Sequence, residues 1–152
     1  MLITPLIGSA MVVGNMAIQI AVMVFVIRLL IRRAHDGAIG HGLLVQIRVL
    51  GWVVLLLFLG HVLQFATWAL LFMVLGEFPD FATAFYHSAV NFTSLGYGDI
   101  VMGEQWRLLG AFDAANGVLM FGLSAGAILS VMNWTLNTPP GRHPLRPKNG
   151  DE

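Results

Sequence analysis

Residues 93–99 read TSLGYGD, and their types and spacing point to chemistry that the backbone performs. Glycine adopts left-handed backbone conformations at little cost, and here glycines stand at the alternate positions Gly96 and Gly98. A strand that alternates in handedness can point successive carbonyl oxygens to one side. Such oxygens can bind a cation in place of water without any charged side chain. The carbonyl groups expected to do so are those of Ser94, Leu95, Gly96 and Tyr97.

The composition of the chain indicates a membrane protein. Of its 152 residues, 57% are hydrophobic and 11% are charged, whereas about 25% of the residues of soluble domains are charged. The formal net charge is zero, which gives no support for binding to nucleic acid. The sequence contains no cysteine, so disulfide and thiol chemistry are excluded.

Residues 1–33 are predicted to form an N-terminal transmembrane helix. The segment is almost entirely apolar and exceeds the roughly 20 residues that a span needs. A cleaved signal peptide is the alternative, but it would place basic residues before the apolar run. Here Arg28, Arg32 and Arg33 follow that run. We therefore expect a retained helix with its N-terminus outside.

The rest of the chain supplies two more predicted spans. Residues 34–48 are expected to form a cytoplasmic loop and the interfacial start of a helix. Residues 49–75 and 106–134 are long and apolar enough to span, and tryptophans lie near their ends. Prolines and basic residues predict a short cytoplasmic tail over 135–152. The expected fold class is an all-α membrane protein with three transmembrane helices.

Between the second and third spans lies a helix that is predicted to be re-entrant. Pro79 suits the first turn of a helix, and Asp80 can cap its free N–H groups. Residues 80–92 are then apolar but too few to cross a bilayer. A short helix that ends in a glycine-rich loop at membrane depth needs protein or a water-filled cavity around it.

The charged residues agree with one topology. Acidic residues fall on one side, at Glu77, Asp80, Asp99 and Glu104. Most basic residues fall on the other, at Arg28, Arg32, Arg33, Arg48, Arg142, Arg146 and Lys148. Because positive charge favours the cytoplasmic side, we expect a cytoplasmic C-terminus and a glycine loop reached from outside, in the plasma or inner membrane of a cell.

With these elements in place, the chain resembles the potassium-channel pore family over roughly residues 45–134. The matched unit is an outer helix, a pore helix, the TSLGYGD stretch as selectivity filter, and an inner helix. The resemblance implies a homotetramer in which four filters surround K⁺ with rings of carbonyl oxygens. Two positions differ from the family pattern, since Ser94 replaces threonine and Leu95 replaces valine. GYGD alone is also found in ordinary turns, so the context is what favours a filter.

The resemblance also implies roles for individual residues. The expected ion-binding residues are Thr93, Ser94, Leu95, Gly96, Tyr97 and Gly98, and those expected near the cavity or gate are Gly117, Val118, Phe121 and Ala125. The family often has an acidic residue late in the pore helix, and Val90 occupies that position here. The residues expected to support the filter are Asp99, Tyr86, His87, Asn91 and Asp113. For Asp113 two interpretations stay open: a bond to Tyr86, His87 or Asn91 behind the filter, or a place near the interface with water or Arg107.

The sequence therefore predicts passive, potassium-selective transport and no enzymatic activity. No cofactor is expected, with K⁺ as the permeant ion. The expected partners are further copies of the chain and membrane lipid, with no nucleic acid and no small-molecule ligand domain. Two alternatives remain: a weakly selective cation channel, suggested by Ser94 and Leu95, and a non-conducting subunit of a larger channel assembly.

Overall fold

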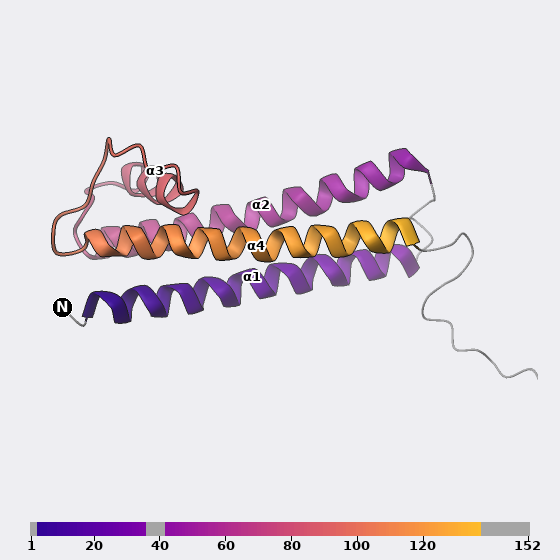
Figure 1. Ribbon diagram of the computed structural model, residues 1–152, viewed down its shortest axis with the longest axis horizontal. Helices are drawn as coiled ribbons and strands as arrows, with labels where there is room; N and C mark the ends of the chain where they lie inside the picture. The colour runs from indigo at the N-terminus through magenta and orange to yellow at the C-terminus, as the bar shows by residue number, and fades with distance from the viewer. Residues whose placement is uncertain (1–2, 36–41, 138–152) are drawn as a thin grey trace, which may run out of the picture.

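The computed structural model describes residues 3–35 and 42–137, and over these residues the regular structure is helical. The helices are α1 (Ile3–His35), α2 (Leu43–Val74), α3 (Phe81–Phe92) and α4 (Arg107–Asn137). The three long helices run side by side, and the short α3 lies against one end of them (Figure 1). The predicted tail beyond residue 137, and residues 36–41 of the predicted 34–48 segment, lie outside the described residues.

Three helices are long and apolar enough to cross a membrane, as predicted. Within the described residues these segments are Ile3–Arg33, Leu43–Val74 and Arg107–Thr135. The second is one unbroken helix, and its first residues, up to Arg48, fall in the 34–48 segment for which the sequence analysis expects the interfacial start of a helix. Nothing between Leu43 and Arg48 breaks a helix. At 1.5 Å per residue, 32 residues extend about 48 Å, so α2 reaches well beyond a hydrocarbon layer of about 30 Å.

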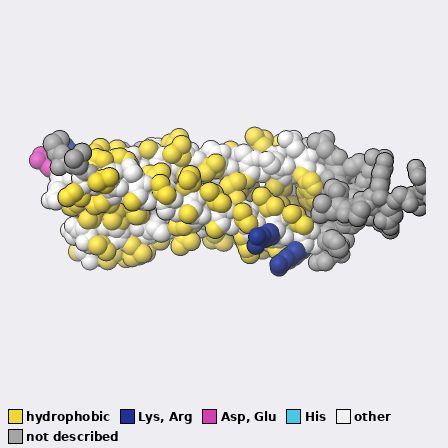
Figure 2. Space-filling view, turned by 90° about the horizontal axis from the view of Figure 1, so that it is seen from below, with side chains coloured by type: hydrophobic (Ala, Val, Ile, Leu, Met, Phe, Trp, Pro, Cys, Tyr) yellow, Lys and Arg dark blue, Asp and Glu magenta, His cyan; other side chains and the backbone are white. Residues whose placement is uncertain are grey.

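The two ends of the molecule differ in charge. The start of α1, the end of α2 and α3 share one end, whereas the start of α2 and the end of α4 share the other (Figure 1). Arg28, Arg32 and Arg33 fall in the last turns of α1. In Figure 2 hydrophobic side chains cover much of the visible face, with Lys and Arg side chains near one end and Asp or Glu at the other. This pattern is that of a membrane protein.

The short helix α3 has distinct start signals. Gly76, with a φ of +76°, ends the preceding helix, and such a conformation favours glycine. Asp80 then caps α3, because its carboxylate accepts hydrogen bonds from the Thr83 N–H at 2.9 Å and from the Thr83 hydroxyl at 2.8 Å. The buried face of α3 packs on α2 and α4 around aromatic side chains. The members of this core include Phe65, Trp68, Phe72, Phe78 and Phe92.

Helix α1 packs against both α2 and α4. An added Cβ at Gly8 would lie 2.6 Å from the Phe112 ring of α4, and one at Gly60 would lie 3.2 Å from Val22 of α1. Glycines therefore permit close approach at both interfaces. Near the opposite end a second apolar cluster joins the same three helices; it consists of Val26, Val53, Leu57 and Val131.

Between these apolar contacts lies a closed ring of four buried polar side chains. The Gln19 amide donates to the Ser124 hydroxyl at 2.8 Å, and that hydroxyl lies 3.0 Å from His61 Nε2. His61 Nδ1 lies 3.3 Å from Gln64 Oε1, and the Gln64 amide returns to Gln19 Oε1 at 2.9 Å. Each of these four contacts pairs a donor with an acceptor when His61 is neutral with its proton on Nδ1. The polar ring thus joins α1 to both other long helices.

Candidate ion-binding site

The 93–99 loop leaves the C-terminal end of α3 in a defined direction. The Ser94 N–H donates to Asn91 O at 2.7 Å. The next two N–H groups, of Leu95 and Gly96, both donate to Val90 O, at 2.9 and 3.3 Å. The main-chain donors therefore point back to the helix. Among the described residues, no hydrogen bond ends on the carbonyl oxygens of residues 94–97.

The backbone of the loop alternates in handedness. Positive φ values occur at Ser94 (58°), Gly96 (56°) and Gly98 (73°). Glycine makes this conformation easy at two of these positions, and the sequence analysis expects it there. Ser94 extends the alternation by one step, although a left-handed conformation costs an L residue about 1–2 kcal/mol. An alternating strand with free carbonyl oxygens is what a backbone cation site requires.

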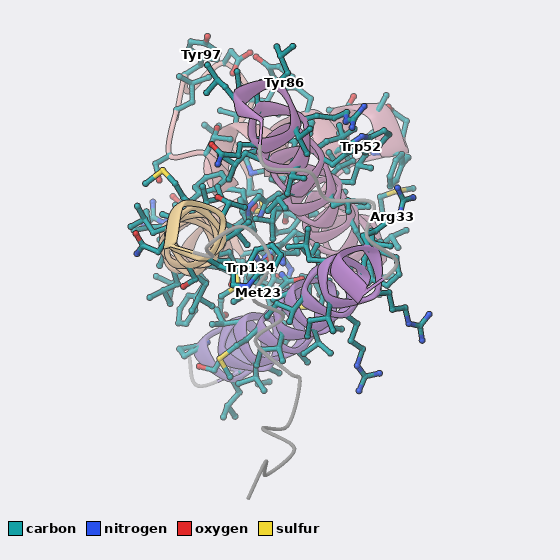
Figure 3. All side chains as sticks on the ribbon, turned by 90° about the vertical axis from the view of Figure 1, so that its right-hand side faces the viewer. Met23, Arg33, Trp52, Tyr86, Tyr97 and Trp134 are labelled. Carbon is teal, nitrogen blue, oxygen red and sulfur yellow. The ribbon has the colours of Figure 1, made fainter. Side chains whose placement is uncertain are left out.

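The loop lacks cover in a single chain. All seven residues of the 93–99 loop are exposed, including Tyr97, which is 67% exposed. Its ring lies at the edge of the molecule (Figure 3). An apolar ring as exposed as that of Tyr97 indicates that this surface contacts another molecule.

Four of the five predicted support residues form hydrogen bonds behind the loop. The Tyr86 hydroxyl donates to Asp99 Oδ2 at 2.7 Å. His87 Nδ1 lies 3.0 Å from the carbonyl oxygen of Ile100, and its Nε2 lies 2.8 Å from the Asn91 amide nitrogen. One tautomer fits both contacts, with His87 Nδ1 donating to Ile100 and Nε2 accepting from Asn91. Ile100, which the sequence analysis misses, acts through its backbone and so leaves no side-chain signal.

Asp113 does not make the bond that one interpretation gives it. Both of its carboxyl oxygens are buried and lack a hydrogen-bond partner among the described residues. Its three proposed partners are engaged elsewhere, Tyr86 with Asp99 and the other two, His87 and Asn91, with each other. The other interpretation, a place near the interface with water or Arg107, stays a prediction; Asp113 itself is fully buried. Its carboxyl group lies beside the Ser88 hydroxyl instead.

The predicted inner-helix residues divide between two faces of α4. Val118, Phe121 and Ala125 are exposed in the single chain. Gly117 is buried, and an added Cβ there would overlap the carbonyl oxygen of Phe92, the last residue of α3. The resemblance places Gly117 near the cavity or gate, and in the structure Gly117 packs against the end of α3.

Comparison with known families shows to which family the chain belongs. A family model described as "Ion channel" matches residues 47–133, which is more than half of the chain. The protein belongs to the ion-channel family. Comparisons with curated proteins and with solved structures find no significant match. The protein is therefore a membrane-embedded channel that transports ions passively, and it is not an enzyme.

The matched region ties the channel function to particular elements. It runs from Ile47 in α2 through α3 and the 93–99 loop to Asn133 in α4. Helix α1 lies outside it. The closed polar ring and the Gly8 contact therefore attach an additional helix to the channel unit.

The Tyr86 to Asp99 bond predicts an effect of pH on this channel. The hydrogen bond from Tyr86 is the main cause that holds the pKa of Asp99 below its usual value, and it raises the pKa of Tyr86. The bond is therefore fully present above the usual pKa of Asp99 and is lost as pH falls through the lowered one. Tyr86→Phe should return the Asp99 pKa toward its usual value, so acid should inhibit ion flux at a higher pH than in the wild type.

Flux measured in liposomes over an acidic pH series tests this expectation. Asp99→Asn serves as the control, because in a chain that carries it the further substitution Tyr86→Phe should no longer change the acid profile. Identical acid profiles for the wild type and Tyr86→Phe would show that this bond does not govern the loop.

Proposed function

We propose that the protein is a potassium-selective channel in which four copies place the 93–99 loop around one axis. The observation that supports this most is the alternation of left-handed residues at Ser94, Gly96 and Gly98 beside carbonyl oxygens that accept no hydrogen bond from the described residues. Carbonyl oxygens from four such loops replace the hydration shell of K⁺ in filters of this type. No charged side chain is needed, which favours rapid release of the ion.

The need for further copies follows from the exposed surfaces of a single chain. One loop supplies only one side of an ion-binding ring. The loop and the face of α4 with Val118, Phe121 and Ala125 are both open. A closed four-fold arrangement covers both surfaces with identical contacts, and it turns this face of α4 toward a central cavity.

The orientation that we propose follows from the basic end of the molecule. The arginines at the end of α1 and Arg48 near the start of α2 belong in the cytoplasm. Helix α3 then enters from outside as a re-entrant helix, and its C-terminus points toward the membrane centre. A helix C-terminus has a partial negative charge, so four of them favour a cation in the cavity below the loop.

Ion flux into liposomes that contain only the purified chain tests this function. We expect K⁺ flux with little Na⁺ flux, and loss of the K⁺ flux in Gly96→Ala, because alanine is strained at a φ of +56°. Comparable K⁺ and Na⁺ fluxes would support the weakly selective alternative, which is suggested by the departures from the family pattern at Ser94 and Leu95. Absence of flux from a correctly assembled protein would support a non-conducting subunit.

A further inference from the structure

Two buried helix faces meet behind the loop with their polar atoms unpaired. Ser88 of α3 and Asp113 and Asn116 of α4 are each fully buried. Five of their side-chain atoms have no hydrogen-bond partner in the described part of the chain: Ser88 Oγ, both carboxyl oxygens of Asp113, and both polar atoms of the Asn116 amide. Asp113 and Asn116 are three residues apart and so share a face of α4. This group of three residues is called the Asp113 cluster below.

Unpaired polar atoms in such a place require a partner. Buried polar groups in folded proteins nearly always form hydrogen bonds, either with protein or with ordered water. If such a group is left unpaired, most of the hydration free energy that it loses on burial is not recovered. Three neighbouring residues with five unpaired atoms therefore indicate that something else occupies or completes the cluster.

An ionised Asp113 would also lack a compensating charge. Arg107 is the only basic residue of α4, but it is exposed and stands six residues earlier, about 9 Å along the helix axis. His87 of α3 is bonded to Ile100 and Asn91, and His61 of α2 belongs to the closed polar ring. A buried carboxylate without a paired cation is strongly disfavoured relative to the neutral acid.

We propose that Asp113 is a neutral carboxylic acid and that the Asp113 cluster binds a buried water molecule between α3 and α4. Water both donates and accepts hydrogen bonds, and the cluster offers both kinds of group. The Asn116 amide nitrogen and the acid proton donate, whereas the remaining oxygens accept. A metal cation would use only the oxygens and would leave the amide N–H groups unpaired. Buried waters of this kind usually bond to several polar groups.

The position of the cluster gives this water a role in the channel scaffold. Ser88 lies one turn before the end of the helix that positions the 93–99 loop. Asn116 precedes Gly117, whose backbone approaches the carbonyl group of Phe92. The water would therefore bridge α3 and α4 beside the close contact between Gly117 and Phe92. The site does not depend on which cation passes through the loop.

Infrared spectroscopy of the full-length channel in lipid tests the protonation state. At neutral pH we expect a C=O stretching band of a protonated carboxylic acid, absent in Asp113→Asn and retained in the control Glu104→Gln, which alters an exposed carboxylate. Ser88→Ala keeps the acid, so it should retain the band and shift its frequency through the changed hydrogen bonding. Carboxylate bands alone, or a protonated band unchanged by Asp113→Asn, would overturn the proposal.

Two further measurements test the ligand. A high-resolution structure should contain density for one water within about 3 Å of at least two side chains of the Asp113 cluster. Direct hydrogen bonds among those side chains, with no water between them, would overturn the water site. Thermal unfolding at fixed K⁺ and increasing Na⁺ should respond equally in the wild type and Asp113→Asn. Stabilisation by Na⁺ that disappears in Asp113→Asn would instead identify a bound cation and overturn the proposal.

Discussion

Gly117→Ala is expected to reduce ion flux about 5- to 150-fold, because overpacking typically costs about 1–3 kcal/mol and the added methyl group here meets rigid backbone. The added methyl group would overlap the carbonyl oxygen of Phe92, so α3 and α4 would have to separate. Phe92 ends the helix that positions the 93–99 loop, so this separation would move the loop itself. Flux in liposomes, normalised to the amount of assembled protein, measures the effect.

Gly51→Ala is the matched control for this substitution. Gly51 lies within α2, and an added Cβ there meets no atom within 4 Å. Without a clash, alanine should favour the helix by about 1 kcal/mol relative to glycine. We therefore expect unchanged flux and an equal or higher yield. Full flux from Gly117→Ala would show that close contact with Phe92 is not required.

Gln64→Leu is expected to lower the free energy of unfolding by about 1–2 kcal/mol, an estimate from the cost of unpaired buried groups and from hydrogen bonds measured in membranes. Gln64 contacts Gln19 Oε1, His61 Nδ1 and the carbonyl oxygen of Asn15. Leucine fills a similar volume but opens the closed polar ring. Denaturant titration of the channel in detergent micelles, followed by tryptophan fluorescence, measures the change.

Gln46→Leu is the same substitution at a site where few hydrogen bonds would be lost. Gln46 lies in the same helix, and its amide makes one long hydrogen bond, of 3.5 Å, to Thr135 O. Its effect on the free energy of unfolding should therefore be much smaller. Equal effects of the two substitutions would mean that the ring does not stabilise the packing of α1.

The sequence predicts the long helices because their apolar runs exceed the thickness of a bilayer. It also predicts the start of α3, because Asp80 caps the helix locally, whereas Pro79, expected in the first turn, lies one residue before the cap. It expects a helix to start at the interface before residue 49, and α2 begins at Leu43. The segment Leu43–Arg48 contains Gln46 and Arg48, which are typical of an interfacial region, and the helix runs through it without a break. Polar residues in a sequence indicate where a segment leaves the lipid. The end of a helix is set instead by where its backbone hydrogen bonds stop.

The site is predictable to the extent that it depends on neighbouring residues. Gly96 and Gly98 predict an alternating backbone. The left-handed conformation of Ser94 is not predictable, because serine usually avoids it. The bond from Tyr86 to Asp99 depends on how the loop folds back on α3, and the burial of Asp113 depends on how α3 lies against α4. Such pairings need side-chain geometry between separate elements, which one sequence does not contain.

The closed polar ring has a consequence for how the chain is made. Gln19 and its partner Ser124 are 105 residues apart, so at a synthesis rate of about 5–20 residues per second Gln19 waits roughly 5–20 s for it. During that interval the Gln19 amide stands on a helix in lipid without the hydroxyl group that accepts its hydrogen bond. Nascent chains that stop before α4 keep this defect. Incomplete chains thus display a feature by which cellular quality control can distinguish them from finished ones.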